Sequence, residues 1–299
     1  RSSDLPRNGL LSKVMDRLLS VVVSVYNEEK ALEEFYRETT HVLEQISWDY
    51  ELLFVNDGSR DGSQDILDRM AASDSRVRVI SFSRNFGHEA AMIAGLDYSR
   101  GDGIICMVAD LQHPPECIPD ILAKFEEGYQ VINMVRTKNR TAGLVKNITS
   151  SGFYWLINRI SDVHFEANAS DFFAVSRHVA QVLKNSYREK VRFLRGYVQN
   201  VGFKKTAVEY EARARVAGES KYSIKKLFVS SINTILCFSN MPLKLGIYAG
   251  IFSALLGLAV MIYTLCTRKG APSGYATIVV LICFMFAMMF VIIGIIGEY

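Results

Sequence analysis

The chain has 299 residues, of which 49% are apolar and 22% are charged, and its formal net charge is +3 at pH 7. A chain of this length holds one large domain and a further segment, and so small a net charge does not indicate a nucleic-acid partner, so none is expected. We interpret residues 1–14 as an expression leader ahead of a native start at Met15 and expect them to take no part in the fold.

Apolar runs alternate with amphipathic runs over the first 135 residues. The apolar runs predict strands, and the runs with helical spacing predict helices. The expected strands cover residues 18–25, 50–55, 77–81, 104–108 and 130–135. The expected helices cover about residues 26–45, 64–72 with Ser63 as the cap, 86–98 and 117–127. This alternation predicts an α/β domain with a largely parallel sheet and helices on both faces.

The stretch from Ile104 to Glu116 is central to the interpretation. Its first five residues are apolar, as in a strand buried on both faces. Asp110, Gln112, a histidine and two prolines follow, and prolines end the hydrogen-bond ladder of a sheet. Asp110 is therefore expected at the carboxyl end of a central strand, where open α/β sheets bind ligands.

Residues 136–159 contain five Lys or Arg residues and no Asp or Glu. Apolar residues at helical spacing, with aromatic residues beside them, predict a basic amphipathic helix over 141–160. Such a helix is typical of a segment that lies on an anionic membrane surface. A helix packed on the domain with its basic face in water explains the pattern equally well, so the sequence leaves both interpretations open.

Two segments near the C-terminus, 245–266 and 276–297, each have 22 residues without a charged side chain. As helices they would be about 33 Å long, which matches the roughly 30 Å hydrocarbon core of a bilayer. We therefore predict two transmembrane helices within residues 241–299, preceded by an amphipathic juxtamembrane segment over 220–240. An even number of spans leaves both chain ends on one side, and flanking lysines favour the cytoplasmic side for the globular part, although Arg268 and Lys269 oppose this orientation.

Carboxylates follow three of the expected strands: Glu28, Asp57 and Asp110. The sequence lacks a Gly-x-Gly-x-x-Gly fingerprint after the first strand, which argues against a dinucleotide cofactor. It also lacks a Walker loop and a Gly-x-Ser-x-Gly elbow. Single carboxylates near a basic segment fit a divalent cation that holds a diphosphate, because Mg²⁺ takes few protein carboxylates and completes its shell with phosphate and water.

Four motifs occur in order: 21–29 (VVVSVYNEE), 55–59 (VNDGS), 109–116 (ADLQHPPE) and 215–222 (RVAGESKY). Together they resemble the family 2 inverting glycosyltransferases, in particular the branch that uses polyprenyl phosphates and carries two C-terminal spans. The resemblance covers residues 15–299 and implies a GT-A fold for a catalytic domain over 15–219. It implies transfer of a sugar from a nucleotide sugar, UDP-glucose by default, to a polyprenyl phosphate.

The resemblance also implies roles for residues at matching positions. Asp110 would bind Mg²⁺ or Mn²⁺ with support from Gln112, and Asp171 matches the family's candidate catalytic base. The residues expected to bind the donor are Tyr26, Asn27, Glu28, Asp57, Ser59, Ala109, Asp110, Gln112, Arg215 and Lys221. Those expected to bind the acceptor phosphate are Arg136, Arg140, Lys146 and Ser150.

Physical chemistry leaves the role of Asp171 open. A phosphate acceptor is already an anion at neutral pH, so a strong base is less necessary than for a hydroxyl acceptor. Asp171 can therefore either accept a proton or orient a substrate. His88 and His113 are interpreted as turn or helix-start residues rather than acid–base groups.

Three departures from the family pattern stand out: Val108 replaces the first carboxylate of the usual Asp-x-Asp, Ser24 replaces a proline, and Phe173 replaces a frequent arginine. Val108 puts donor or metal affinity in question. One alternative function is therefore a catalytically impaired, membrane-anchored protein that binds nucleotide sugars. Another is a processive polysaccharide synthase, although the chain has no Gln-x-x-Arg-Trp signature. The sugar, the lipid length and the formation of a homo-oligomer stay open.

Overall fold

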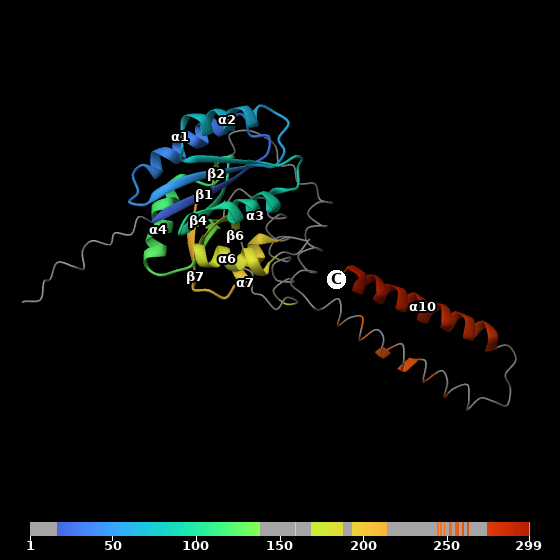
Figure 1. The fold of residues 1–299 in the computed structure, drawn as a ribbon. Helices are drawn as coiled ribbons and strands as arrows, with labels where there is room; N and C mark the ends of the chain where they lie inside the picture. Colours follow the sequence, from blue (N-terminus) through green and yellow to red (C-terminus); the bar gives the residue numbers. More distant parts are fainter. Residues whose placement is uncertain are drawn as a thin grey trace, which may run out of the picture. The chain divides into compact units, whose positions relative to one another are not determined.

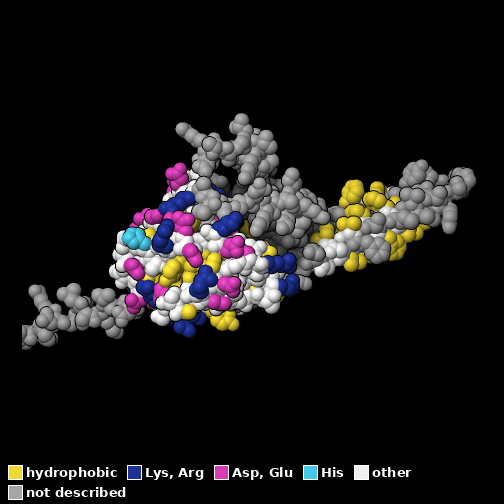
Figure 2. Space-filling view, turned by 90° about the horizontal axis from the view of Figure 1, so that it is seen from above, with side chains coloured by type: hydrophobic (Ala, Val, Ile, Leu, Met, Phe, Trp, Pro, Cys, Tyr) yellow, Lys and Arg dark blue, Asp and Glu magenta, His cyan; other side chains and the backbone are white. Residues whose placement is uncertain are grey.

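The computed structural model describes residues 17–137, 159, 169–187, 193–213, 274–298 and single positions between 244 and 262. The chain divides into two compact units, one formed by residues 1–151 and 164–222 and the other by residues 152–163 and 223–299. Figure 2 shows charged side chains of both signs over the visible face of the first unit. The expected leader 1–14, the juxtamembrane segment 220–240 and all of the helix 141–160 except Arg159 lie outside the described residues.

The first unit alternates strands with helices, as its sequence predicts (Figure 1). Its strands are β1 (Leu18–Val25), β2 (Asp49–Asn56), β3 (Val77–Ser81), β4 (Gly103–Val108), β5 (Val131–Arg136), β6 (Ala169–Ser176) and β7 (Lys205–Tyr210). Its helices are α1 (Leu32–Leu43), α2 (Ser63–Ser73), α3 (His88–Tyr98), the 3-10 turn η1 (Pro115–Cys117), α4 (Ile118–Glu126), α6 (Arg177–Ser186) and α7 (Leu194–Asn200). The five strands predicted up to residue 136 are confirmed.

The seven strands form one sheet in the order β3-β2-β1-β4-β6-β5-β7. Strands β1, β2, β3 and β4 pair in parallel, and β7 is parallel to β5. Strand β6 is antiparallel to both of its neighbours, β4 and β5. The mostly parallel sheet is thus confirmed, and β4, which precedes Asp110, lies at its centre.

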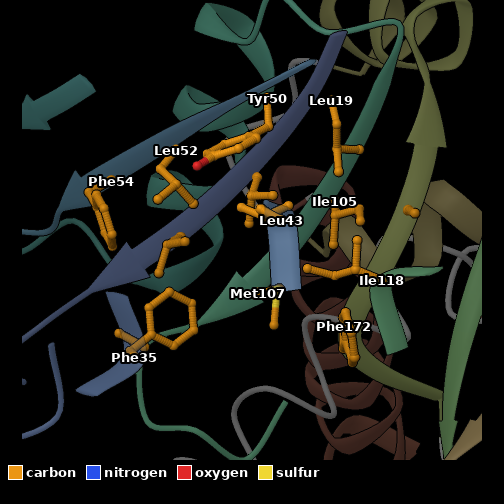
Figure 3. Packing of buried hydrophobic residues seen from close by; sticks show 14 of the residues in the cluster. Leu19, Phe35, Leu43, Tyr50, Leu52, Phe54, Ile105, Met107, Ile118 and Phe172 are labelled. Carbon is orange, nitrogen blue, oxygen red and sulfur yellow. The ribbon is translucent and has the colours of Figure 1, made fainter. Parts of the chain in front are cut away.

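One face of the sheet packs on α1, α2 and α4 through a continuous hydrophobic core. Alternate residues of the strands point to this face, because successive side chains of a strand alternate between its two sides. Figure 3 shows Phe35 and Leu43 of α1 directed toward the side chains of the sheet, with Phe54, Ile105 and Phe172 among them. The rings of Phe35 and Phe54 meet edge to face at 6.3 Å.

The other face is covered by α3, α6 and α7. Helix α3 lies very close to β1, since a Cβ at Gly95 would stand 2.0 Å from a methyl group of Val22. A glycine at this position allows the helix backbone to approach the strand. The close approach fixes the N-terminal end of α3, which carries His88 and Glu89, near the carboxyl end of β1.

Two local predictions are wrong. The first helix begins at Leu32 rather than at Tyr26, because Asn27 has a left-handed backbone (φ 56) and residues 27–29 donate hydrogen bonds to the loop after β2. Ser63 does not cap α2: its hydroxyl instead accepts the Glu28 amide hydrogen bond at 3.0 Å. In both cases, hydrogen bonds between the loops after β1 and β2 form in place of the helical structure that the local sequence predicts.

The second unit contains α10 (Gly274–Glu298), which includes the predicted span 276–297. Described side chains of this unit that are large, hydrophobic and exposed include Tyr248, Phe252, Ile278, Phe284 and Ile293. Hydrophobic side chains of this unit are yellow in Figure 2. Within the described part of the chain, no helix satisfies the length and hydropathy criteria for crossing a membrane.

Candidate active site

The loops after β1 and β2 are locked together by side-chain hydrogen bonds. The Asn27 amide donates to Oγ of Ser59 at 3.0 Å, and Oδ1 of Asn27 accepts from the Arg60 amide at 2.8 Å. The Glu28 amide donates to Ser63 in the same way. Three of the residues predicted to bind the donor, Asn27, Glu28 and Ser59, are therefore held at the carboxyl edge of the sheet by one another's loops.

Asp57 lies at the end of β2 and is 2% exposed. Its carboxylate accepts hydrogen bonds from the amides of Phe86 at 2.7 Å and Gly87 at 3.0 Å. The neighbouring Gly58 has φ +65, and a Cβ there would stand 2.4 Å from the carbonyl carbon of Arg84. Asp57 and Gly58 thus fix the loop that leads from β3 into α3, beside the predicted nucleotide position.

Asp110 follows β4, and its side chain is largely buried. Its Oδ1 accepts the Gln112 amide hydrogen bond at 3.1 Å, and Leu111 between them has a positive φ of 60. The two predicted cation ligands therefore lie two residues apart in one tight turn. Ala109, also predicted to line the donor site, is fully buried beneath it.

His113 lies at the end of this loop and holds it against the end of β4. Its Nδ1 accepts a hydrogen bond from the Val108 amide at 3.2 Å, and its ring stacks on Phe172 of β6 with centroids 4.8 Å apart. Burial lowers the pKa of His113 to about 3, with Asp171 opposing and Arg136 reinforcing this shift. The imidazole is therefore neutral with its proton on Nε2, which suits a structural role in the turn.

Asp171 lies on β6, which runs antiparallel to β4, so the start of β6 meets the end of β4. Cys106 pairs with Phe173, and continuing this register by two residues brings Asp171 level with Val108. Arg195 donates to Oδ1 of Asp171 from Nε at 3.1 Å and from a terminal nitrogen at 2.9 Å. The Asp171 side chain is 35% exposed, so it can contact a ligand while paired with Arg195.

His88 approaches Asp171 from the side of α3. Its Nε2 lies 3.8 Å from Oδ2 of Asp171, and its Nδ1 lies 2.7 Å from Oγ of Ser24 at the end of β1. His88 is the first residue of α3, in line with its interpretation as a helix-start residue. The ring nevertheless connects two strands of the sheet at the edge where the predicted site lies.

The surroundings of Asp171 and Glu89 shift the pKa values of these two carboxyl groups in opposite directions. Burial raises the pKa of Asp171, but the positive charge of the neighbouring Arg195 and its hydrogen bonds outweigh it, so this pKa lies below the usual value. Burial and the charge of Asp171 raise the pKa of Glu89 to about 7, against the Leu194 hydrogen bond and Arg195. Asp171 is therefore an anion at neutral pH, and it is a weak proton acceptor.

Asp110 and Gln112 fit a hard divalent cation such as Mg²⁺ or Mn²⁺, because both side chains offer oxygen donors at one turn. Among the residues that the structure describes, no group of three or more His, Cys, Asp or Glu side chains could hold a metal ion. A site of this composition suits a cation that takes its other ligands from a diphosphate and water.

The structure brings part of the predicted site to one edge of the sheet. This set consists of Tyr26, Asn27, Glu28, Asp57, Ser59, Ala109, Asp110, Gln112, Arg136 and Asp171. Arg136 is the last residue of β5 and is partly buried. The other predicted residues, Arg140, Lys146, Ser150, Arg215 and Lys221, lie outside the described residues.

Sequence reasoning missed Arg195 and Glu89 and gave Ser24 no role. Arg195 stands in the run 188–195, which has four Lys or Arg residues, but nothing in that run distinguishes the arginine that pairs with Asp171. The position of Glu89 beside His88 was visible, but its partner lies 105 residues away. Only the packing of α3 against α7 reveals the contact.

Comparison with known proteins identifies the family. The sequence model of glycosyl transferase family 2 matches residues 20–188, and that of the GtrB C-terminal hairpin matches residues 241–299. The uncharacterized glycosyltransferase YkcC of Bacillus subtilis (strain 168) is 41% identical over 283 residues, which are 94% of this chain and 87% of the relative. The bactoprenol glucosyl transferase of Shigella phage SfV is 38% identical over 284 residues, which are 94% of this chain and 92% of the relative.

A solved structure supports the same fold. Glucosyl-3-phosphoglycerate synthase from Mycobacterium tuberculosis, crystallised with Mn²⁺, UDP-glucose and phosphoglyceric acid, superposes with a TM-score of 0.50 at 18% identity. The match covers 74% of this chain and 78% of that one, and it supports the GT-A-like arrangement of the first unit. The chain belongs to glycosyltransferase family 2, carries the GtrB-type C-terminal hairpin and is a glycosyltransferase.

Proposed function

We propose that this enzyme transfers a sugar, with inversion, from a nucleotide sugar to a polyprenyl phosphate, and that the donor is UDP-glucose. The observation that carries the proposal is the placement of Asp110 and Asp171 at one edge of the sheet, at the end of β4 and the start of β6. Relatives named bactoprenol glucosyl transferase support a lipid acceptor and a glucosyl donor.

Separate sets of residues would bind the donor and the acceptor. Asp110 and Gln112 would hold Mg²⁺ or Mn²⁺, which, when bound, neutralises the charge of the departing diphosphate. Asp57 and the Asn27 loop would receive the nucleotide. Arg136, with Arg140, Lys146 and Ser150, would bind the acceptor phosphate beside this edge.

Asp171 is proposed to orient the reactants rather than to remove a proton. An acceptor phosphate attacks as an anion, so no proton has to leave it. The pairing with Arg195 and the lowered pKa of Asp171 support this role, because both stabilise the ionised carboxylate. Catalysis would then come from positioning and from charge stabilisation.

The membrane arrangement is part of the proposal. The segments 245–266 and 276–297 would cross the bilayer, with the catalytic domain on the cytoplasmic side. The match of residues 241–299 to the GtrB hairpin and the uncharged sequence of both segments support the two spans. Spans would keep the active site beside an acceptor that is dissolved in the bilayer.

A second function is a protein that binds a nucleotide sugar without transferring it. Val108 at the end of β4 favours this alternative, because the family usually has a carboxylate there. A measurement of sugar transfer distinguishes the enzyme from the binding protein.

The test uses the full chain in proteoliposomes that contain a polyprenyl phosphate, with labelled UDP-glucose and Mn²⁺. The expected product is label in the lipid fraction, formed with UDP release and dependent on the lipid phosphate. Liposomes without the lipid phosphate measure donor hydrolysis. Donor binding without labelled lipid would support the binding protein, and transfer only from another nucleotide sugar would correct the proposed donor. Repeated sugar addition to one acceptor would indicate a processive synthase.

A further inference from the structure

Glu89 is a partly buried carboxyl group in the first turn of α3, and the proposed chemistry does not use it. Its Oε2 accepts a hydrogen bond of 2.8 Å from the backbone amide of Leu194. Leu194 is the first residue of α7 and is 3% exposed. The contact therefore ties the start of one helix to the start of another, across 105 residues of sequence.

The residue after Leu194 is Arg195, whose guanidinium holds Asp171. Two hydrogen bonds from this guanidinium reach the same oxygen, Oδ1, at 3.1 and 2.9 Å. Because Arg195 directly follows Leu194, the position of the Leu194 backbone determines the point from which the Arg195 side chain extends. A short helix of seven residues has little internal stability, so its first turn depends on such tertiary contacts.

The residue before Glu89 contacts the same carboxylate from the other side. His88 Nε2 lies 3.8 Å from Oδ2 of Asp171, and Nδ1 lies 2.7 Å from Oγ of Ser24. One turn of α3 thus approaches Asp171 directly, through His88, and indirectly, through Glu89, Leu194 and Arg195. Arg195 thus orients Oδ1 of Asp171 through hydrogen bonds, and His88 lies beside Oδ2.

We propose that Glu89 is a positioning residue for sugar transfer, which holds the start of α7 through the Leu194 amide so that Arg195 keeps the Asp171 carboxylate oriented. The inference rests on the proposed function, because Asp171 is placed in the transfer site there. Glu89 does not touch the substrates in this scheme. Its effect is on turnover and not on affinity for the donor or the lipid.

The charges agree with this arrangement. Glu89 and Asp171 are the carboxyl groups in the cluster, and Arg195 is the cation that influences both of them. A protonated Glu89 still offers its carbonyl oxygen to the Leu194 amide, while Arg195 stays with Asp171. The tether therefore needs an oxygen acceptor at position 89 and does not need a negative charge.

This distinction defines the variants. Glu89→Gln keeps the oxygen acceptor, Glu89→Ala removes it, and Glu89→Asp shortens its reach. We expect Glu89→Ala to lower kcat about tenfold, as for loss of one hydrogen bond, with both KM values within about threefold. Glu89→Gln should stay within about threefold of the wild type. Asp65→Asn, an exposed carboxyl in the first turn of α2, is the control and should leave kcat unchanged.

A double-mutant cycle with Arg195→Ala distinguishes positioning from general destabilisation. If Glu89 acts through Arg195, adding Glu89→Ala to Arg195→Ala should lower kcat by less than about twofold further. Effects that multiply would overturn the proposal, and so would a wild-type kcat in Glu89→Ala. If Glu89→Ala does not fold, Glu89→Asp takes its place in the cycle.

Hydrogen exchange tests the tether without relying on turnover. In the full chain, peptides that contain Leu194 should exchange about tenfold faster in Glu89→Ala than in the wild type and in Glu89→Gln. Unchanged exchange would overturn the inference even if the wild type showed no transfer. A wild type without lipid-linked product would instead refute the proposed function alone, so the two failures are distinguishable.

Discussion

The imidazole of His113 folds back onto the strand that precedes it, and its Nδ1 accepts the Val108 amide hydrogen bond at 3.2 Å. This contact closes a loop from Val108 to His113 around Asp110. The carboxylate is therefore fixed between the end of β4 and a buried ring. Val108 itself is partly buried and is the residue level with Asp171.

A carboxylate at position 108 should strengthen donor binding. Val108→Asp would add a charged ligand or acceptor beside Asp110, and one charge-assisted contact contributes roughly 1.5–3 kcal/mol. We expect at least about tenfold tighter binding of UDP with Mn²⁺ and a similar gain in transfer. Calorimetry at one metal concentration measures the affinity, with Val108→Asn as the uncharged control. Equal affinities would mean that Asp110 with Gln112 suffices.

Asp110→Asn should abolish transfer, with a loss of at least about 100-fold, because it removes the charge that would bind the cation at the diphosphate. The metal dependence of nucleotide binding should disappear with it. The transfer assay and a Mn²⁺ titration of UDP binding measure both effects. Asp120→Asn, an exposed carboxyl on α4, is the control. Wild-type turnover that is still inhibited by EDTA would contradict the assignment.

Neutralising Arg136 and Arg140 together should weaken use of the lipid phosphate. Each charge-assisted contact to phosphate contributes roughly 1.5–3 kcal/mol, so the KM for the lipid should rise at least about tenfold. Donor affinity should stay within about twofold. The double variant Lys204→Ala with Lys205→Ala, at the edge strand β7, controls for lost positive charge. An unchanged lipid KM would support the packed helix with a solvated basic face.

Glu89 should make the stability of the wild type fall as pH rises. Its pKa lies at about 7 in the folded state, above the value of 4.5 for an ordinary glutamate, so the folded state binds more protons between these values. The stabilisation is complete below about pH 4.5 and is lost as pH rises through about 7. Between pH 5 and 8 the wild type should lose about 1–3 kcal/mol relative to Glu89→Gln. Urea unfolding at both values measures this difference, and parallel profiles would contradict the shift.

Gly95→Ala should destabilise the first unit. The new methyl group would stand 2.0 Å from the Val22 side chain, so α3 would have to move away from β1. Overpacking of this kind costs about 1–3 kcal/mol. A lower melting temperature is expected, and Val22→Ala in the same chain should restore part of it. Equal melting temperatures for Gly95→Ala and the wild type would show that α3 can shift freely.

The sequence by itself determined the local elements up to residue 136. Apolar runs such as 18–25 and 104–108 could be assigned to buried strands because they are short and bounded by turn-forming residues, whereas helices are usually longer. The carboxylates Asp57 and Asp110 could be placed at one edge because the carboxyl ends of parallel strands meet there. The motifs at 21–29, 55–59 and 109–116 carried the family resemblance for the same positions.

The tertiary structure decided what depends on pairing between distant segments. Strand β6 enters between β4 and β5 in the opposite direction, and only its register brings Asp171 level with Val108. Because of contacts between loops, α1 begins at Leu32, and the Ser63 hydroxyl accepts the Glu28 amide hydrogen bond instead of capping α2. The cluster around Asp171 joins α3, β6 and α7, and no local periodicity encodes a hydrogen bond that spans 105 residues.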